Sequence, residues 1–193
     1  MTATAPAGPI DGTRRTVSGL ERASLKPAGI VLAIILGLVF GWIVLDAVIP
    51  TPGTEVAAGD TVTLANQARF VPASGWTIED DKSNFYRISN SGVYFAIQTG
   101  PTQIDAVDVL NNAQNALRQS IPDAVYSSPS TFTTSRGLTG VQSTLTSAQL
   151  TGRLVVVVSS GVYVFANALG PPVSMNALGG DIDAMFESIE ILR

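Results

Sequence analysis

The stretch AGIVLAIILGLVFGWIVL, residues 28–45, divides this 193-residue chain into a short basic N-terminal part and one folded domain. It contains no charged or strongly polar side chain, and further apolar residues extend it past Asp46 to Ile49. A helix needs about 20 apolar residues to cross the hydrocarbon core of a bilayer. Pro50 then ends the helix, because proline cannot continue the hydrogen-bond ladder. The sequence therefore predicts one transmembrane helix over residues 28–49.

The charges on either side of this segment predict its orientation. Basic residues precede it, none follows until Arg69, and the first charged residues after it are acidic. Because positively charged flanks stay in the cytoplasm, we expect a plasma-membrane protein with its N-terminus inside and its C-terminal domain outside. Residues 1–27, rich in Thr, Ala, Pro and Gly, are expected to form a disordered cytoplasmic tail. Residues 50–59 are expected to form a short linker.

A cleaved signal peptide is the alternative to this anchor. Val56-Ala57-Ala58 before Gly59 is a small-residue pattern typical of cleavage sites. However, the apolar run is longer than the usual ~7–15-residue core of a signal peptide, and the pattern lies far beyond its end. We therefore favour an uncleaved anchor. The chain has no cysteine, so no cysteine carries a lipid in its place.

Small residues recur every four positions within the predicted membrane helix. They are Gly29, Ala33, Gly37 and Gly41, and this spacing places them on one helix face. Small side chains allow a second helix to approach closely, and Gly37-x-x-x-Gly41 has the spacing typical of packed membrane helices. Gly and Ala are also common in membrane helices that pack against nothing. The pattern thus favours a packing face for a membrane protein partner without requiring one.

Composition excludes several functions for the remaining chain. The net charge of −4 and the lack of a basic patch argue against a nucleic-acid partner. The chain has no histidine, which removes the commonest general base and the commonest transition-metal ligand. It has no cysteine for a disulfide, so the domain must rely on its core for stability. No cofactor is expected.

Residues 60–193 are expected to form one extracytoplasmic domain. Alternating or continuous apolar residues predict strands within 61–64, 70–78, 85–88, 93–99, 131–134, 140–146, 150–158 and 162–166. Turn-forming residues predict a turn at 80–84 and a hairpin loop at 89–92. Leu154–Val158 is apolar at every position, which is typical of a strand covered on both faces.

Two helices are predicted, over 102–121 and from about 181 to 192. Thr102 and Asp105 resemble a capping box at the start of the first, with Asp in place of the usual Glu. The apolar residues at helical spacing in this helix are Ile104, Val107, Leu110, Ala113, Leu117 and Ile121. The Asn and Gln side chains expected on its exposed side are at positions 111, 112, 114, 115 and 119. The apolar face of the last helix carries Ile182, Met185, Phe186 and Ile189.

Two short motifs in this domain resemble those of a known family. FVPASGW, residues 70–76, resembles the P-x-G-W entry of PsbP/Mog1-like domains with one extra residue, and DAMFESI, residues 183–189, resembles their closing helix. LpqN-type envelope proteins of actinobacteria also resemble this pattern. The resemblance covers about residues 60–193 and implies an α+β fold, in which helices pack on a twisted antiparallel sheet. It also implies non-enzymatic accessory proteins that bind larger protein complexes, and it brings no catalytic residue.

The chain departs from the LpqN type because it lacks a lipidated cysteine. The predicted transmembrane helix takes the place of that lipid anchor. An envelope location is therefore kept, whereas shared partners do not follow from the resemblance.

Few residues suggest catalysis or metal binding. Asp181-x-Asp183 could hold a divalent cation, but acids at a helix start explain the pair better, since calcium needs roughly six to eight oxygen ligands. Glu79-Asp80-Asp81 could pair with a basic partner, and a solvated turn is the simpler explanation. A Ser–Lys pair would need Lys82, the only lysine of the domain. No G-x-S-x-G, P-loop or G-x-G-x-x-G motif is present.

Aromatic side chains are the remaining candidates for a binding site. Trp76, Tyr86, Tyr94 and Tyr163 could line a groove for a lipid, a glycan or a peptide, although such residues more often lie in a core. The leading hypothesis is a single-pass envelope adaptor whose outer domain binds protein. The second is a carrier of an envelope lipid or other small apolar ligand, and the third is an enzyme that uses carboxylates alone. Co-purified lipid would favour the second, and an exposed apolar patch on a filled domain the first.

Overall fold

The structure is a computed structural model that describes residues 53–192. No helix within this range is long and apolar enough to cross a membrane. The predictions that fall outside the range are the cytoplasmic tail, the transmembrane helix and its small-residue face at Gly29, Ala33, Gly37 and Gly41. They stay predictions.

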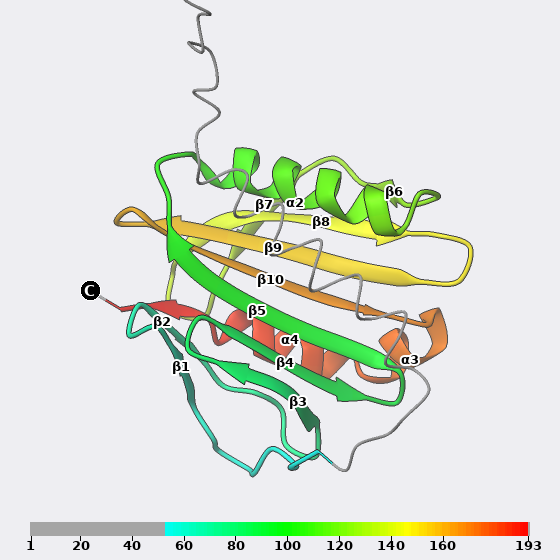
Figure 1. Cartoon of the computed structure of the whole chain (residues 1–193), viewed down its shortest axis with the longest axis horizontal. Helices are drawn as coiled ribbons and strands as arrows, with labels where there is room; N and C mark the ends of the chain where they lie inside the picture. The colour runs from blue at the N-terminus through cyan, green and yellow to red at the C-terminus, as the bar shows by residue number, and fades with distance from the viewer. Residues whose placement is uncertain (1–52, 193) are drawn as a thin grey trace, which may run out of the picture.

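One large antiparallel sheet forms the centre of the domain (Figure 1). Its strands are β3 (Thr77–Lys82), β4 (Phe85–Asn90), β5 (Val93–Pro101), β6 (Val125–Tyr126), β7 (Ser130–Thr133), β8 (Thr139–Thr146), β9 (Thr151–Ser159) and β10 (Val162–Gly170). They lie in the order β3-β4-β5-β10-β9-β8-β6, and β7 also pairs with β8. Each neighbouring pair is antiparallel. The predicted α+β class, an antiparallel sheet with packed helices, is therefore confirmed.

A small sheet and three helices complete the described domain. The small sheet has the order β1-β2-β11 and consists of β1 (Val62–Leu64), β2 (Ala68–Phe70) and β11 (Glu190–Ile191). The helices are α2 (Ala106–Ser120), α3 (Pro172–Ala177) and α4 (Gly179–Glu187). Figure 1 shows α2 on one face of the large sheet and α4 on the other. The sheet is therefore the middle layer between two separate helix contacts.

Strand β9 contributes to both cores because its successive side chains point to opposite faces. Leu154 and Val156 lie in the core beneath α2, whereas Val155 and Val157 lie in the core beneath α4. All four are at most 1 % exposed. The prediction of a strand covered on both faces is confirmed.

The hairpin predicted around residues 89–92 also forms, with a shorter loop than expected. β4 and β5 are joined by Ser91 and Gly92 alone, which have φ angles of 50° and 78°. Positive φ at both positions matches the right-handed twist of a two-residue hairpin. The turn predicted at 80–84 is wrong for its first three residues, since β3 continues to Lys82. Charged residues there are compatible with a strand because β3 is an edge strand, where solvent reaches the side chains.

Helix α2 begins later than predicted. Its N-cap is Asp105, whose Oδ1 accepts a hydrogen bond from the backbone N–H of Asp108 at 2.9 Å. Thr102 instead accepts from the backbone N–H of Ile104 at 3.2 Å, in the turn before the helix. The predicted capping box is therefore wrong, because Asp105 and not Thr102 is the N-cap residue. Gln114, predicted on the exposed side, is 7 % exposed and donates to Ser143 Oγ at 3.1 Å, because polar groups tolerate burial once they are paired.

The C-terminal region differs from the single predicted helix. α4 ends at Glu187, and residues 190–191 form β11, which pairs with β2. Ser188 ends the helix, since its hydroxyl donates to Met185 O at 2.8 Å and accepts from Val71 N at 2.9 Å. Ile189 fitted the helical spacing but is buried beyond the helix end. The short helix α3 was not predicted.

The folded part of the chain begins before residue 60. Val56 is 3 % exposed, and its backbone N–H donates to Trp76 O at 2.8 Å. The backbone carbonyl of Thr54 accepts from Ile78 N at 2.8 Å. Residues from Thr54 onwards thus extend the β3 edge of the sheet. The linker predicted at 50–59 is therefore too long, because its residues from Thr54 onwards belong to the folded domain.

Candidate functional site

The two motifs that carried the family resemblance contact each other. Trp76 Nε1 donates at 3.3 Å to Oδ2 of Asp181, which lies two residues before the second motif, in the first turn of α4. Val71, from the same motif as Trp76, bonds through its backbone to Ser188 at the other end of α4. Trp76 is fully buried. The motifs therefore fix α4 against the body of the domain and form no open site.

The four aromatic residues predicted to line a groove do not converge. Trp76 and Tyr86 lie in the core beneath α4 and are 0 % and 3 % exposed. Tyr94 and Tyr163 lie on the opposite face of the sheet, since Tyr163 and Leu169 belong to the core beneath α2 and Tyr94 is paired with Leu169. Tyr94 is near the start of β5 and Tyr163 near the start of β10. Because these strands are antiparallel, the two tyrosines lie at opposite ends of that face.

Burial changes the chemistry of two of these tyrosines. Desolvation raises the pKa of Tyr86, with smaller contributions from the negative charges of Asp81 and Asp60. Desolvation also raises the pKa of Tyr163. Both phenols are therefore protonated and neutral at physiological pH, and neither is activated as a base.

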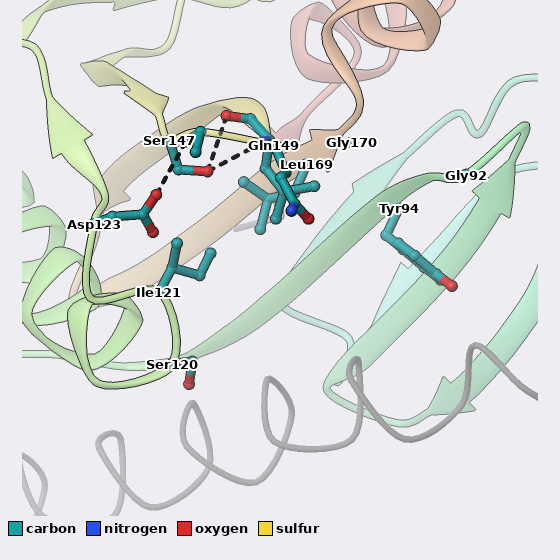
Figure 2. A pocket seen from close by; sticks show the side chains of 11 residues that line it. Gly92, Tyr94, Ser120, Ile121, Asp123, Ser147, Gln149, Leu169 and Gly170 are labelled. Carbon is teal, nitrogen blue, oxygen red and sulfur yellow. Dashed lines mark hydrogen bonds between the residues drawn. The ribbon is translucent and has the colours of Figure 1, made fainter.

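A pocket of about 380 Å³ lies at one end of the large sheet (Figure 2). It is bounded by the C-terminal end of α2, the β8–β9 turn, the start of β5 and the end of β10. Its lining residues are Gly92, Tyr94, Ser120, Ile121, Asp123, Ser147, Ala148, Gln149, Leu150, Leu169 and Gly170. Of the predicted groove residues, this set includes only Tyr94.

Backbone geometry shapes one wall of the pocket. Leu169 lies over Gly152 of the neighbouring strand, and a Cβ at Gly152 would be only 2.2 Å from Leu169 Cδ2. The absence of a side chain at this position therefore lets Leu169 pack down on the sheet, where it is 5 % exposed. A Cβ at Gly170 would be 2.8 Å from Val93 Cγ2, which lies in the core beneath α4.

Polar groups of the pocket mainly hold its own loops. Asp123 Oδ2 accepts a hydrogen bond from the backbone N–H of Ala148 at 3.0 Å, and Ser147 Oγ accepts from Leu150 N at 3.1 Å. Figure 2 shows Asp123 beside the β8–β9 turn, with Tyr94 on the other side. Asp123 is the one charged residue of the described lining. This arrangement suits a small apolar or neutral group and disfavours an anion.

Comparison with known proteins places the fold. No protein-family model matches the chain, and no curated protein matches it. The solution structure of cyanobacterial PsbP (CyanoP) from Synechocystis sp. is similar, with 9 % identity, a TM-score of 0.55, and coverage of 75 % of this chain and 99 % of that one. The domain has a PsbP/Mog1-like fold.

Two further structures resemble this PsbP/Mog1-like domain less closely. The Ran-binding protein Mog1p of Saccharomyces cerevisiae has 8 % identity, a TM-score of 0.49, and coverage of 72 % of this chain and 96 % of its own. LpqN of Mycobacterium tuberculosis, described as involved in cell envelope biogenesis, has 18 % identity and a TM-score of 0.37, with 72 % and 90 % coverage.

Residues considered for catalysis or metal binding have structural partners in the PsbP/Mog1-like domain. Asp181 accepts from Trp76, and Asp183 pairs with Arg153. Lys82 Nζ pairs with Asp80 at 2.7 Å. Within residues 53–192, no group of three or more acidic side chains is arranged to hold a metal ion.

Sequence reasoning missed most of the pocket. The β8–β9 turn lies between the strands predicted at 140–146 and 150–158, but its residues Ser147, Ala148 and Gln149 do not indicate a ligand by composition. Asp123 comes from a turn after α2 and meets Ala148 only because α2 packs beside β8 and β9. A contact between such distant loops leaves no local signal in the sequence.

Proposed function

We propose that this chain is a single-pass membrane-anchored accessory protein whose PsbP/Mog1-like domain lies outside the plasma membrane and binds a protein partner without catalysing a reaction. One observation carries the proposal: the predicted membrane segment ends at Ile49, and the folded domain already begins at Thr54. The domain is thus held close to the bilayer, where the proteins it meets most often are membrane proteins.

The proposal that the domain is not catalytic is supported by the hydrogen bonds and ion pairs that already occupy its candidate catalytic side chains. The acids of α4 are bonded to Trp76 and Arg153, and Lys82 is paired with Asp80. The buried tyrosines with raised pKa values are neutral at physiological pH. The hydroxyl of Ser89 donates to the carboxylate of Glu79, but this pair is exposed on strands β3 and β4 and lies outside the pocket.

The predicted helix face at Gly29, Ala33, Gly37 and Gly41 is the proposed contact with a membrane protein. The test is crosslinking in intact membranes, followed by purification and mass spectrometry, for the unchanged chain and for a Gly37→Leu, Gly41→Leu variant. Leucine would hold a partner helix away, so we expect the crosslinked partner to be lost. A matched control, Ile35→Leu with Val39→Leu, changes residues off this face and should retain it.

Each result of this experiment bears on the proposal. A partner that is retained by the glycine variant moves the interface to the outer domain. Failure of the chain to remain in membranes after alkaline washing would contradict the anchor. Protease added outside intact cells should remove the domain, and protection of the domain would contradict its orientation.

The pocket supports a second candidate function, binding of a small apolar ligand. Its walls include Ile121, Leu150 and Leu169, and its volume of about 380 Å³ falls within the ~300–1,000 Å³ range of ligand sites. Native mass spectrometry of the purified chain would detect a retained lipid. Leu150→Trp should displace that lipid, whereas a mass that equals the protein alone would contradict this candidate.

A further inference from the structure

The chain enters the described domain at one end of the large sheet. Gly53 lies against the first residues of β3, since a Cβ on Gly53 would be 2.3 Å from Thr77 Cγ2. The next residue, Thr54, accepts a hydrogen bond from Ile78 N. The start of β3 therefore marks the end of the domain that is nearest to the predicted membrane segment.

The short helix α3 lies at this same end. The pairing of Thr77 with Ser89 places the start of β3 beside the end of β4, and the two-residue turn at Ser91 and Gly92 leads back into β5. Leu169, near the end of β10, pairs with Tyr94 near the start of β5. Strand β10 therefore ends here, and α3 follows at once. Figure 1 shows α3 beside the β4–β5 turn, at the right of the view.

Helix α3 presents an uncharged surface that is apolar except at Ser174 and Asn176. None of its residues is buried, and Val173 is 81 % exposed, the highest value of any large apolar side chain in the described range. Pro171, Pro172 and Ala177 are also exposed. No charged residue occurs between Arg153 and Asp181. An exposed apolar group of this kind is typical of a surface that contacts protein or membrane.

The short chain between the predicted membrane segment and the domain favours the membrane over a protein as the contact of α3. Only residues 50–52 lie between the predicted span and Gly53, so an extended chain separates Ile49 from Gly53 by at most ~14 Å. The nine-residue strands of the sheet are about 30 Å long, so the opposite end is much farther from the bilayer. From β3 to β10 there are three strand spacings, or roughly 14 Å. Gly53 and α3 can thus both meet one flat surface.

We propose that α3 rests on the outer surface of the lipid bilayer, with Val173 and its neighbouring prolines inserted among the lipid headgroups. This inference rests on the proposed membrane anchor and deepens it, because it gives the domain a fixed orientation. Contact is made by apolar side chains, since the stretch around α3 offers no cation to attract anionic lipid. The domain then presents its opposite end, with the β9–β10 turn, away from the membrane.

The test uses spin labels on the full chain in phospholipid nanodiscs loaded with one copy each. The chain has no cysteine, so Val173→Cys and Val107→Cys each give a single labelled site. Val107 is the matched control, because it is 40 % exposed in the first turn of α2 at the opposite end of the sheet. We expect the label at 173 to be severalfold more accessible to dissolved oxygen than to a water-soluble nickel complex, and the label at 107 to show the reverse.

The outcomes separate this inference from the proposed anchor. A chain that does not enter the discs overturns both. A chain embedded in the disc with equal nickel accessibility at the two sites overturns the contact of α3 alone. A second variant, Ala177→Cys combined with Val173→Asp, should shift the label at 177 toward nickel, and no shift would overturn the role of Val173. Lipid contact that forms only with anionic lipid would overturn the apolar mechanism.

Discussion

At the scale of single residues, Tyr126 is unusual because a polar group is buried without a hydrogen-bond partner in residues 53–192. The hydroxyl of Tyr126 is buried and has no hydrogen-bond partner among the described residues. Its ring lies 4.9 Å from the guanidinium of Arg118. Desolvation raises the pKa of Tyr126 to about 12, although the positive charge of Arg118 opposes the shift. Ionisation of this phenol is therefore less favourable in the folded domain than in the unfolded chain.

The raised pKa of Tyr126 predicts a loss of stability at alkaline pH. Below the unfolded pKa of about 10 the phenol is neutral in both states, and its contribution to stability is complete. Between pH 10 and 12 only the unfolded chain releases the proton, so the free energy of unfolding falls. Tyr126→Phe should remove about 1 kcal/mol of this fall, a value reduced because the residue as a whole is only partly buried. Urea unfolding followed by circular dichroism at pH 7 and pH 11 measures the difference. An equal fall in both proteins would contradict the assignment.

At the scale of elements, apolar periodicity predicted the helices and strands better than their ends. Leu154–Val158 and the alternation in β5 specify strands directly, because each face of a sheet selects every second residue. Ends are set by contacts that the local pattern does not contain. Ile189 continues the helical spacing of α4, yet Ser188 bonds to Val71 from a distant part of the chain and stops the helix. The polar residue Gln114 is buried only because Ser143 lies opposite it.

The start of α2 gives a prediction at this scale. Asp105→Ala should lower the free energy of unfolding by about 1 kcal/mol, since it removes the acceptor for an otherwise unpaired N–H in the first turn. Thr102→Ala removes only a turn contact outside the helix and should cost less. Thermal unfolding of both variants provides the comparison. A larger loss for Thr102→Ala would restore the capping box that the sequence predicted.

At the scale of the whole molecule, the domain includes more of the chain than its sequence pattern indicated. Residues 60–193 carry the resemblance, but Thr54 and Val56 already belong to the fold through backbone bonds to Ile78 and Trp76. The motif residues that could be recognised are packing residues around α4. The pocket and α3 were not predicted, since each depends on loops brought together by the completed sheet.

This early start predicts different stabilities for two fragments. A fragment that begins at residue 53 should unfold cooperatively, whereas one that begins at 60 loses the buried side chain of Val56 and its backbone bonds. We expect a loss of roughly 2–3 kcal/mol in the free energy of unfolding. Urea titration of both fragments measures it, with Val56→Ala in the longer fragment to separate the side chain from the backbone. Equal midpoints would show that 53–59 is a linker after all.

The burial of Trp76 against Asp181 has a practical consequence. The chain contains two tryptophans, and a fragment from residue 53 retains only Trp76, at the contact between α4 and the rest of the domain. Its indole is shielded from water in the native state and hydrated once α4 separates. The emission wavelength of this one fluorophore therefore reports on the docking of the C-terminal helix. The fluorescence of Trp76 thus allows folding of this fragment to be followed without an added label.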